Sequence, residues 1–323
     1  MKIDPHVHCR DGAENYKETI AHVMTLCDQQ GVDMVFDMPN TSPPLLTAAD
    51  LEQRLRLVPD AARDRYRVFL GATADPEQLR QAVELVHERE EVVGLKLFAG
   101  PSVGALAIAS ESAQQMVYRA LAEFKYQGII ALHCEKESLF HATFDPMQPS
   151  THALARPPEA ENESIRDQIN FAGDAGFQGT LHICHISGTG ALDVIRCARA
   201  AAAAGGGGPR LTCAVTPHHL LWSSSQMNGT AGLLYKVNPP LREPSDNIAL
   251  RTALKQGEID WIETDHAPHP LCDKIYPPYA SGFPSLCLYR NLVEEVLPFW
   301  GMDEDAIRRV TCDNICRTFG ISK

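Results

Sequence analysis

Short apolar runs rich in β-branched residues alternate with amphipathic stretches along the whole chain. This alternation is typical of parallel strands joined by helical crossovers. Eight runs are predicted strands, and they are Lys2 to His8, Val32 to Met38, Tyr66 to Ala72, Val92 to Phe98, Ile129 to Glu135, Thr180 to Ser187, Leu211 to Pro217 and Trp261 to His266. Because doubly wound sheets more often have about five to seven strands, the pattern favours a single α/β domain over residues 1–323, a (β/α)8 TIM barrel.

Several predicted helices have recognisable ends. Thr47 and Asp50 have the spacing of a capping box, and Gly31 and Gly257 stand where helices are expected to stop. The alanine and glycine run at 201–208 lies between a predicted helix and a predicted strand. We interpret this run as an extended loop, because glycine ends helices.

Three long irregular segments follow predicted strands, and they are Phe140 to Pro158, Trp222 to Arg242 and Pro268 to Phe283. Barrels place their active sites at the carboxyl ends of the strands and in the loops that follow them. We therefore expect all three segments to border the functional site.

The first predicted strand carries the clearest local motif, Asp-Pro-His-Val-His-Cys-Arg at residues 4–10. In an extended strand His6, His8 and Arg10 share one face, because they recur at every second position. Two neutral imidazoles supply half of a first-row metal site, and a guanidinium suits a carboxylate. Taken alone, the motif also fits a polar strand end with unconnected histidines.

Lys96 lies inside the apolar run Val-Val-Gly-Leu-Lys-Leu-Phe. Burying a bare ammonium ion without a partner is costly. In one interpretation Lys96 faces outward and extends its amine to solvent. In the other, the buried amine takes up carbon dioxide to form a carbamate, an anion able to bridge two metal ions.

Matching residues stand at the ends of later strands. His133 and His185 each end an otherwise hydrophobic run, and Asp265 ends the last one. His182 lies three positions before His185, so strand alternation predicts that it faces the opposite side as a satisfied core residue. A carboxylate can ligate a metal ion through one oxygen and exchange protons through the other. The sequence therefore predicts a metal centre at one mouth of the barrel, with Asp265 as the catalytic residue and with the ligands His6, His8, Lys96, His133, His185 and Asp265.

Composition narrows the choice of ligand and location. The formal charge of −12 and the acidic pI near 5.5 argue against nucleic acid or an anionic membrane as partner, because both need a positive surface. A small-molecule substrate is expected instead. No signal peptide and no apolar run of about 20 residues is recognised, and the ten cysteines lack CxxC spacing. These features predict a cytoplasmic protein with reduced thiols, and a homodimer is the expectation on frequency alone.

Seven motifs together resemble those of dihydroorotases, members of the amidohydrolase superfamily. They are Asp-Pro-His-Val-His-Cys-Arg (4–10), Phe-Asp-Met-Pro-Asn-Thr (36–41), Gly-Leu-Lys-Leu-Phe (94–98), His-Cys-Glu (133–135), His-Ile-Cys-His-Ile-Ser (182–187), Val-Asn-Pro-Pro-Leu-Arg (237–242) and Thr-Asp-His-Ala-Pro-His (264–269). The resemblance covers nearly the whole chain. The metal residues also fit hydantoinases and allantoinases, whereas Arg10, Met-Pro-Asn-Thr and Asn-Pro-Pro-Leu-Arg favour dihydroorotase.

The resemblance implies two divalent metal ions, for which histidine and carboxylate ligands suit zinc, with cobalt or manganese as substitutes. The first ion would be held by His6, His8, carbamylated Lys96 and Asp265, and the second by Lys96, His133 and His185, with a hydroxide between the two. For the substrate, the resemblance implies that Arg10, Asn40 and His269 bind the α-carboxylate and that Asn238 contacts the pyrimidine ring. Backbone groups around Gly282-Phe283-Pro284 would close the far side of the pocket.

The implied reaction is the reversible interconversion of N-carbamoyl-L-aspartate and L-dihydroorotate, the third step of pyrimidine synthesis. Two features depart from the family pattern. The His-x-His motif begins at residue 6, so we expect a barrel without the accessory β-sandwich of larger amidohydrolases. Compact dihydroorotases also carry a Thr-Thr pair on a mobile loop, and no such pair follows Lys96 or stands in the later long loops.

Two alternative functions remain open at this stage. One is another cyclic amidohydrolase that acts on a hydantoin, a dihydropyrimidine or allantoin. The other is a non-catalytic barrel that serves as a structural partner, for instance of aspartate transcarbamoylase. The second alternative predicts lost metal ligands, yet all six expected ligands are present.

Overall fold

Eight parallel strands form one sheet in the order β1 to β8 in the computed structural model, which describes residues 1–101, 106–229 and 231–322. Parts of the segments after Lys96 and after Trp222, and the last residue, lie outside the described residues. The strands are β1 (Ile3–Val7), β2 (Met34–Asp37), β3 (Tyr66–Gly71), β4 (Val92–Ala99), β5 (Ile129–Cys134), β6 (Thr180–Ile183), β7 (Arg210–Val215) and β8 (Trp261–Ile262). A bridge between Val7 and His266 brings the two edges together, and His8 N donates to His266 O over 2.8 Å. The predicted α/β barrel is therefore confirmed.

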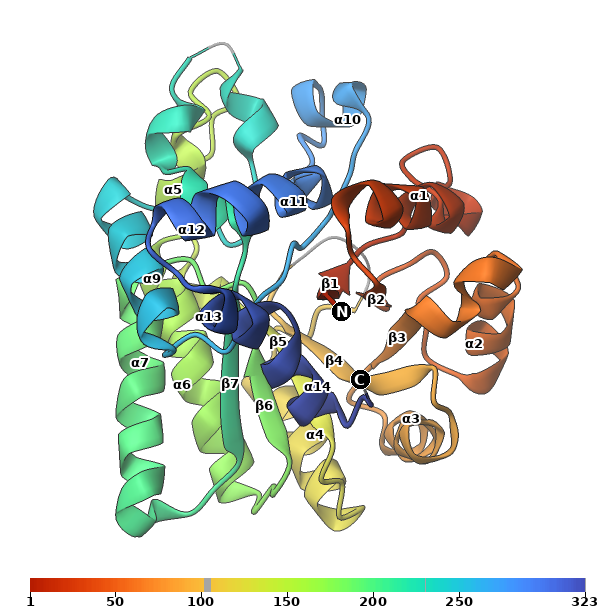
Figure 1. Cartoon of the computed structure of the whole chain (residues 1–323). Coiled ribbons are helices and arrows are strands. Elements are labelled where there is room, and N and C mark those ends of the chain that lie inside the picture. The colour runs from red at the N-terminus through yellow and green to blue at the C-terminus, as the bar shows by residue number, and fades with distance from the viewer. Residues whose placement is uncertain (102–105, 230, 323) are drawn as a thin grey trace.

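Helices surround the strands on the outside (Figure 1). They are α1 (Ile20–Gln30), α2 (Ala48–Leu55), α3 (Pro76–Glu88), α4 (Glu111–Glu123), α5 (Thr151–Ala155), α6 (Pro158–Asp174), α7 (Thr189–Ala201), α8 (Pro217–Leu221), α9 (Pro244–Gln256), α10 (Leu271–Ile275), α11 (Tyr289–Asn291), α12 (Leu297–Phe299), α13 (Glu304–Arg308) and α14 (Asn314–Phe319). The Thr47 and Asp50 capping box starts α2, and Gly31 and Gly257 end α1 and α9 with positive φ, as predicted. Among the described residues, no helix is both long and apolar enough to cross a membrane.

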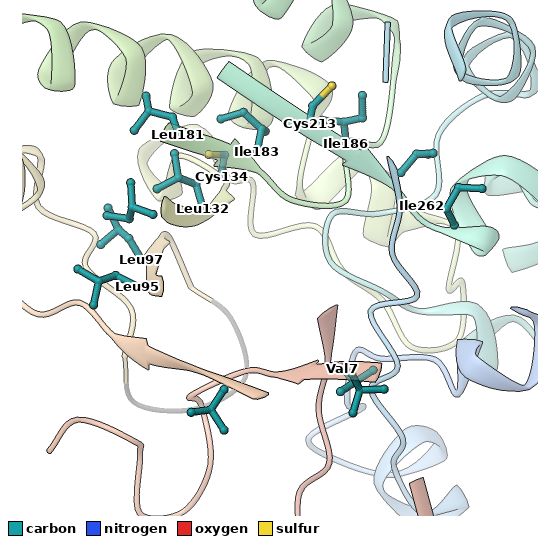
Figure 2. Packing of buried hydrophobic residues seen from close by; sticks show 14 of the residues in the cluster. Val7, Leu95, Leu97, Leu132, Cys134, Leu181, Ile183, Ile186, Cys213 and Ile262 are labelled. Carbon is teal, nitrogen blue, oxygen red and sulfur yellow. The ribbon is translucent and has the colours of Figure 1, made fainter. Parts of the chain in front are cut away.

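The main hydrophobic core lies between the strands and the helices. Figure 2 shows Leu95, Leu97, Leu132, Leu181 and other strand residues that belong to this buried cluster. Side chains of a strand alternate between its two faces, so the residues between these leucines point to the inside of the barrel. The outward half of each strand thus stabilises the fold, and the inward half is available for the site.

A second buried cluster fills the barrel interior below the strand ends. It includes Phe36, Phe69 and Trp261, and Phe319 of α14 packs against their rings with centroid distances of 4.9, 6.0 and 5.8 Å. The C-terminal helix therefore closes one end of the barrel, and the polar residues lie towards the other.

Strands β6 and β8 end earlier than the hydrophobic pattern predicts. His185 and Asp265 have φ values of 37° and 47°, in the left-handed region that few residues other than glycine adopt. A residue in this conformation cannot continue a strand. Non-glycine residues in this region occur at functional sites, where the surrounding structure enforces them.

The run at 201–208 also differs from the prediction. Its alanines extend the helical path of α7 by one turn through Gly206, and only the glycines end it, with φ values of 93°, 65° and 106° at Gly205, Gly207 and Gly208. Alanine favours helix strongly, whereas glycine supplies the left-handed turn.

Candidate active site

Three predicted ligands from the first and last strands converge at the barrel mouth. Potential ligand atoms of His6, His8 and Asp265 all lie within 4.8 Å of one another. Asp265 Oδ1 is 2.9 Å from His8 Nε2 and 3.4 Å from His6 Nε2. All three residues are buried, so solvent competes little for their ligand atoms.

The other predicted ligands lie beside this group. His133 Nδ1 is 3.2 Å from His185 Nε2, and the ring centroids of His185 and His6 are 5.3 Å apart. Lys96 is 1% exposed, which rules out the outward orientation considered from the sequence. Its Nζ donates to Cys184 Sγ over 3.1 Å and stands 5.1 Å from the Phe98 ring centroid. The structure therefore brings all six predicted ligands into one place.

The donor set fits divalent metal ions. His8 Nδ1 donates to Asn40 Oδ1 over 2.8 Å, and burial lowers the pKa of His8 to about 4, so its Nε2 carries a lone pair at neutral pH. This lone pair faces the carboxylate of Asp265, which holds its charge. Two facing acceptors repel each other unless a cation lies between them. His185 Nδ1 is also buried and has no hydrogen-bond partner among the described residues. Imidazole and carboxylate donors are those that zinc prefers.

Asp265 is ionised despite complete burial. Burial alone would raise its pKa, but the charge of the neighbouring His6 outweighs that effect and holds the pKa well below its usual range. An ionised carboxylate at this position can bind a cation with one oxygen and accept a proton on the other.

Two buried carboxylates that the sequence analysis missed orient the imidazoles. Glu263 accepts from His6 Nδ1 over 3.0 Å and from the backbone N of His185 over 2.8 Å. Glu135 Oε2 lies 3.1 Å from His133 Nε2 and forms a two-pronged ion pair with Arg156. Such outer partners fix the orientation of metal-binding histidines. Their spacing is the signal, because each glutamate stands two residues from a predicted ligand.

His182 is a satisfied core residue, as predicted, but the reason given for it is wrong. Its Nε2 lies 3.1 Å from Glu263 Oε2, its Nδ1 lies 3.1 Å from Thr212 Oγ1, and its ring stacks on Trp261. It therefore faces the barrel interior, the same side as His185. The alternation rule fails here because β6 ends at Ile183, before His185.

A small cavity next to the predicted metal ligands is lined by His8, Arg10, Asn40, Asn238, Asp265, Ala267, Ser281 and Gly282. Arg10 is 2% exposed, and its Nε and Nη1 have no hydrogen-bond partner among the described residues. An unpaired buried guanidinium is unfavourable unless an anion joins it. The cavity is therefore suited to a ligand that carries a carboxylate.

The remaining predicted substrate residues border the same space. His269 Nε2 is 3.4 Å from Arg10 Nη2, and burial, with Arg10 as the next cause, lowers the pKa of His269 to about 2, so this imidazole is neutral. Asn238 Oδ1 lies 3.0 Å from His152 Nε2. An adjoining cleft shares Asn238 and Ser281 with the cavity and also contacts His269, so it connects the cavity with the surface loops.

Two lysines link the loops that line the cavity and the adjoining cleft. Lys236 Nζ donates to Tyr279 O and Ser281 Oγ over 2.8 and 2.9 Å, and Lys274 Nζ donates to Lys236 O and Gly282 O over 3.1 and 2.5 Å. Among the described residues neither ammonium has a carboxylate within 4 Å. Burial, together with the charge of Lys236, lowers the pKa of Lys274 to about 7.

We expect Lys274→Met to flatten the pH dependence of stability. In the unfolded chain Lys274 keeps its proton up to its usual pKa of 10.5, whereas the folded protein releases it near 7. The unfolded state then binds more protons between these values, so this lysine makes the free energy of unfolding rise with pH in that window. Urea unfolding at pH 7 and 9 measures the slope, with Lys255→Met on the exposed side of α9 as control. Equal slopes of the free energy of unfolding against pH for wild type and Lys274→Met would contradict the expected release of the Lys274 proton on folding.

Known proteins with similar sequences indicate the family of this chain. No known family profile matches the chain. Dihydroorotase of Staphylococcus aureus is 32% identical over 280 residues, which are 85% of this chain and 62% of that protein. Dihydroorotase of Methanothermobacter thermautotrophicus is 30% identical over an alignment of 328 positions, which covers 99% of this chain and 69% of that protein. The chain thus spans 62–69% of the length of these two curated relatives, and less than two thirds of the staphylococcal one.

Solved structures share the fold. L-hydantoinase (dihydropyrimidinase) of Arthrobacter aurescens has a TM-score of 0.81 and 22% identity, with 99% of this chain and 70% of that chain covered. Dihydroorotase of Campylobacter jejuni has a TM-score of 0.73 and 17% identity, with 100% and 84% covered. At this identity the structures support the barrel alone. The sequence relationship to the Methanothermobacter enzyme is closer and extends over almost every residue, and on that ground this chain belongs to the dihydroorotase family.

Proposed function

We propose that this chain catalyses the reversible interconversion of L-dihydroorotate and N-carbamoyl-L-aspartate in de novo pyrimidine biosynthesis. The observation that carries the proposal is the unpaired guanidinium of Arg10 in a cavity that it shares with Asp265 and His8. A cyclic amide that bears a carboxylate matches both halves of this cavity. Hydantoins and dihydropyrimidines without a carboxylate leave the buried charge of Arg10 unmatched, which costs binding energy.

Each residue around the cavity has a proposed role. Arg10 binds the α-carboxylate of the substrate, assisted by Asn40 and by the neutral imidazole of His269. Asn238, which also lines this cavity, contacts the pyrimidine ring. In ring opening, Asp265 accepts the proton of the attacking water and delivers it to the leaving ring nitrogen, and in ring closure it acts in reverse.

The proposed ligands divide between two divalent ions. His6, His8, Lys96 and Asp265 would hold the first, and Lys96, His133 and His185 the second, with Lys96 as a carbamate. Zinc is the proposed metal, since nitrogen and oxygen donors suit it. When bound, the ions supply a water of lowered pKa and polarise the amide carbonyl. Glu263 and Glu135 support this arrangement, because each holds one imidazole of the set in a fixed orientation.

Steady-state assays with four substrates test the proposal. We expect turnover of dihydroorotate to exceed that of hydantoin, dihydrouracil and allantoin, with metal analysis made on the same sample. Opening of a hydantoin without turnover of dihydroorotate would instead assign the chain to another cyclic amidohydrolase activity. Purified protein without bound metal and without activity on any of the four would favour the structural partner of aspartate transcarbamoylase.

We also propose that the protein is a cytoplasmic homodimer. All ten cysteines are free thiols, which supports a reducing compartment. The dimer is proposed only because two-fold homodimers are the commonest oligomers. Light scattering of the eluted protein tests it, and a monomer mass would contradict it.

A further inference from the structure

A buried polar cluster lies beside the backbone of Arg10 and outside the lining of the cavity. It consists of Asp37 at the end of β2, Arg54 in α2 and Tyr66 at the start of β3, and these side chains are at most 4% exposed. Asp37 Oδ2 accepts from Arg54 Nε, Arg54 Nη2 and Tyr66 Oη over 3.0, 2.5 and 2.5 Å. None of the three lines the cavity that contains Arg10. Their position gives them no direct role in the proposed chemistry.

The cluster is bonded to the backbone that carries Arg10. Arg54 Nη1 donates to the carbonyl oxygen of Arg10, and the backbone N of Cys9 donates to Asp37 Oδ1 over 2.8 Å. Arg10 and Asp11 have φ values of 51° and 62°, so two successive residues have a positive φ, which residues with a side chain rarely adopt. Such backbone conformations persist in residues with a side chain only where the surrounding structure enforces them. Contacts from outside the turn must therefore hold it.

An arginine can hold the backbone turn at Arg10 better than a lysine can. Its planar fork donates in fixed directions, and here two of its nitrogens bind Asp37 while the third reaches the Arg10 carbonyl. Burial alone would lower the pKa of Arg54, but the charge of Asp37 outweighs it and raises the pKa above the ordinary value. Burial raises the pKa of Tyr66 well above its usual range, so its hydroxyl stays a donor. Asp37 therefore holds Arg54 in place through Nε and Nη2, and Nη1 remains available to bind the Arg10 carbonyl.

We propose that Arg54 is a positioning residue for substrate binding, because it fixes the backbone turn that aims the Arg10 guanidinium into the cavity. This inference rests on the proposed function, in which Arg10 binds the substrate carboxylate. Arg54 acts through Arg10 and not on the reacting amide. Its loss should therefore weaken binding of the carboxylate while the proton transfers at Asp265 continue.

Arg54→Lys is the test, because it keeps the charge beside Asp37 and removes the arm that reaches Arg10. We expect KM for dihydroorotate to rise by about 10-fold or more, since a shift of about 1 Å can cost about 10²-fold, and kcat to stay within about 3-fold. The matched control is Arg199→Lys. Arg199 also pairs with a carboxylate, Asp260, and also donates to backbone carbonyls, but beside the start of β8. The Arg199→Lys substitution should lower the Tm without changing KM for dihydroorotate.

A double-variant cycle separates positioning from general damage. In an Arg10→Gln background the effect of Arg54→Lys on KM should disappear, because the group it positions is gone. Equal effects of Arg54→Lys in both backgrounds, or a folded Arg54→Lys protein with wild-type KM, would overturn the inference.

Two further results keep the outcomes distinct. If Arg54→Lys fails to fold, Asp37→Asn is the second test, because it weakens the ion pair with Arg54 but keeps an acceptor for Cys9 N. This variant should also raise KM for dihydroorotate. An unchanged KM would overturn the inference. Wild-type protein that does not turn over dihydroorotate would contradict the proposed function itself. Active wild type with unchanged variants contradicts only the role of Arg54.

Discussion

Asp265→Ala is expected to lower kcat for dihydroorotate by about 10³-fold or more while the protein stays folded. A positioned acid–base group contributes about 10²- to 10⁴-fold, and Asp265 is also a proposed metal ligand. Its carboxylate lies 2.9 Å from His8 Nε2 and is held ionised in a buried site. Residues at the carboxyl ends of barrel strands serve chemistry more than stability, so stability should fall little. Steady-state kinetics, metal content and thermal unfolding measure the three effects.

The control for this variant stands at the other end of the same strand. Asp260 directly precedes β8, accepts from Arg199 and from the backbone N of Cys213, and is remote from the cavity. In barrels, residues at the amino ends of strands serve stability and those at the carboxyl ends serve chemistry. Asp260→Ala should therefore lower the Tm and keep kcat, the reverse of Asp265→Ala. Global unfolding of Asp265→Ala, or kcat within about 10-fold of wild type, would contradict the assignment.

Strand periodicity made most of this site predictable from the sequence. Lys96 stands between two leucines, and His133 stands between Leu132 and Cys134. These neighbours pack outward in the hydrophobic core, so an alternating pattern alone turns Lys96 and His133 inward. The eight strands then bring residues that are far apart in the chain to one mouth. This reasoning needs only local pattern and the rule that parallel strands of a barrel end at the same face.

Periodicity fails where the strand itself ends. His185 and Asp265 adopt left-handed conformations just past β6 and β8, and no local pattern marks the change. For the same reason the side predicted for His182 relative to His185 was wrong. The position of such residues depends on long-range contacts, for example the bond from the backbone N of His185 to Glu263.

The supporting residues were harder to predict because their role arises only from tertiary contacts. Arg54 is 44 residues from Arg10 in sequence and meets its carbonyl only in the folded chain. In the sequence Arg54 is one more charged residue of an amphipathic helix. The role of Glu263 was easier to predict, since this residue precedes Asp265 by two positions.

Lys96→Ala is the second variant with a large expected effect. The buried amine of Lys96 has one hydrogen bond, to Cys184 Sγ, and no carboxylate within 4 Å among the described residues. As an ammonium it would add positive charge beside two divalent ions that face a single carboxylate, Asp265. A carbamate reverses this sign. The neutral amine bonds to the carbon of carbon dioxide, one proton leaves, and the lysine nitrogen then carries an anionic carboxylate group.

We therefore expect Lys96→Ala to lose about 10³-fold or more in kcat and most of its bound metal. A short carboxylic acid such as acetate or propionate should restore part of both, because it can occupy the space of the missing carbamate. Lys136→Ala is the matched control, since Lys136 pairs with Glu111 and Asp167 outside the site, and it should show neither loss nor rescue. Intact-protein mass spectrometry under native conditions should reveal one added carbon dioxide in wild type and none in Lys96→Ala. A metal-loaded wild type whose Lys96 remains a free amine would contradict the carbamate, even if the variant were inactive.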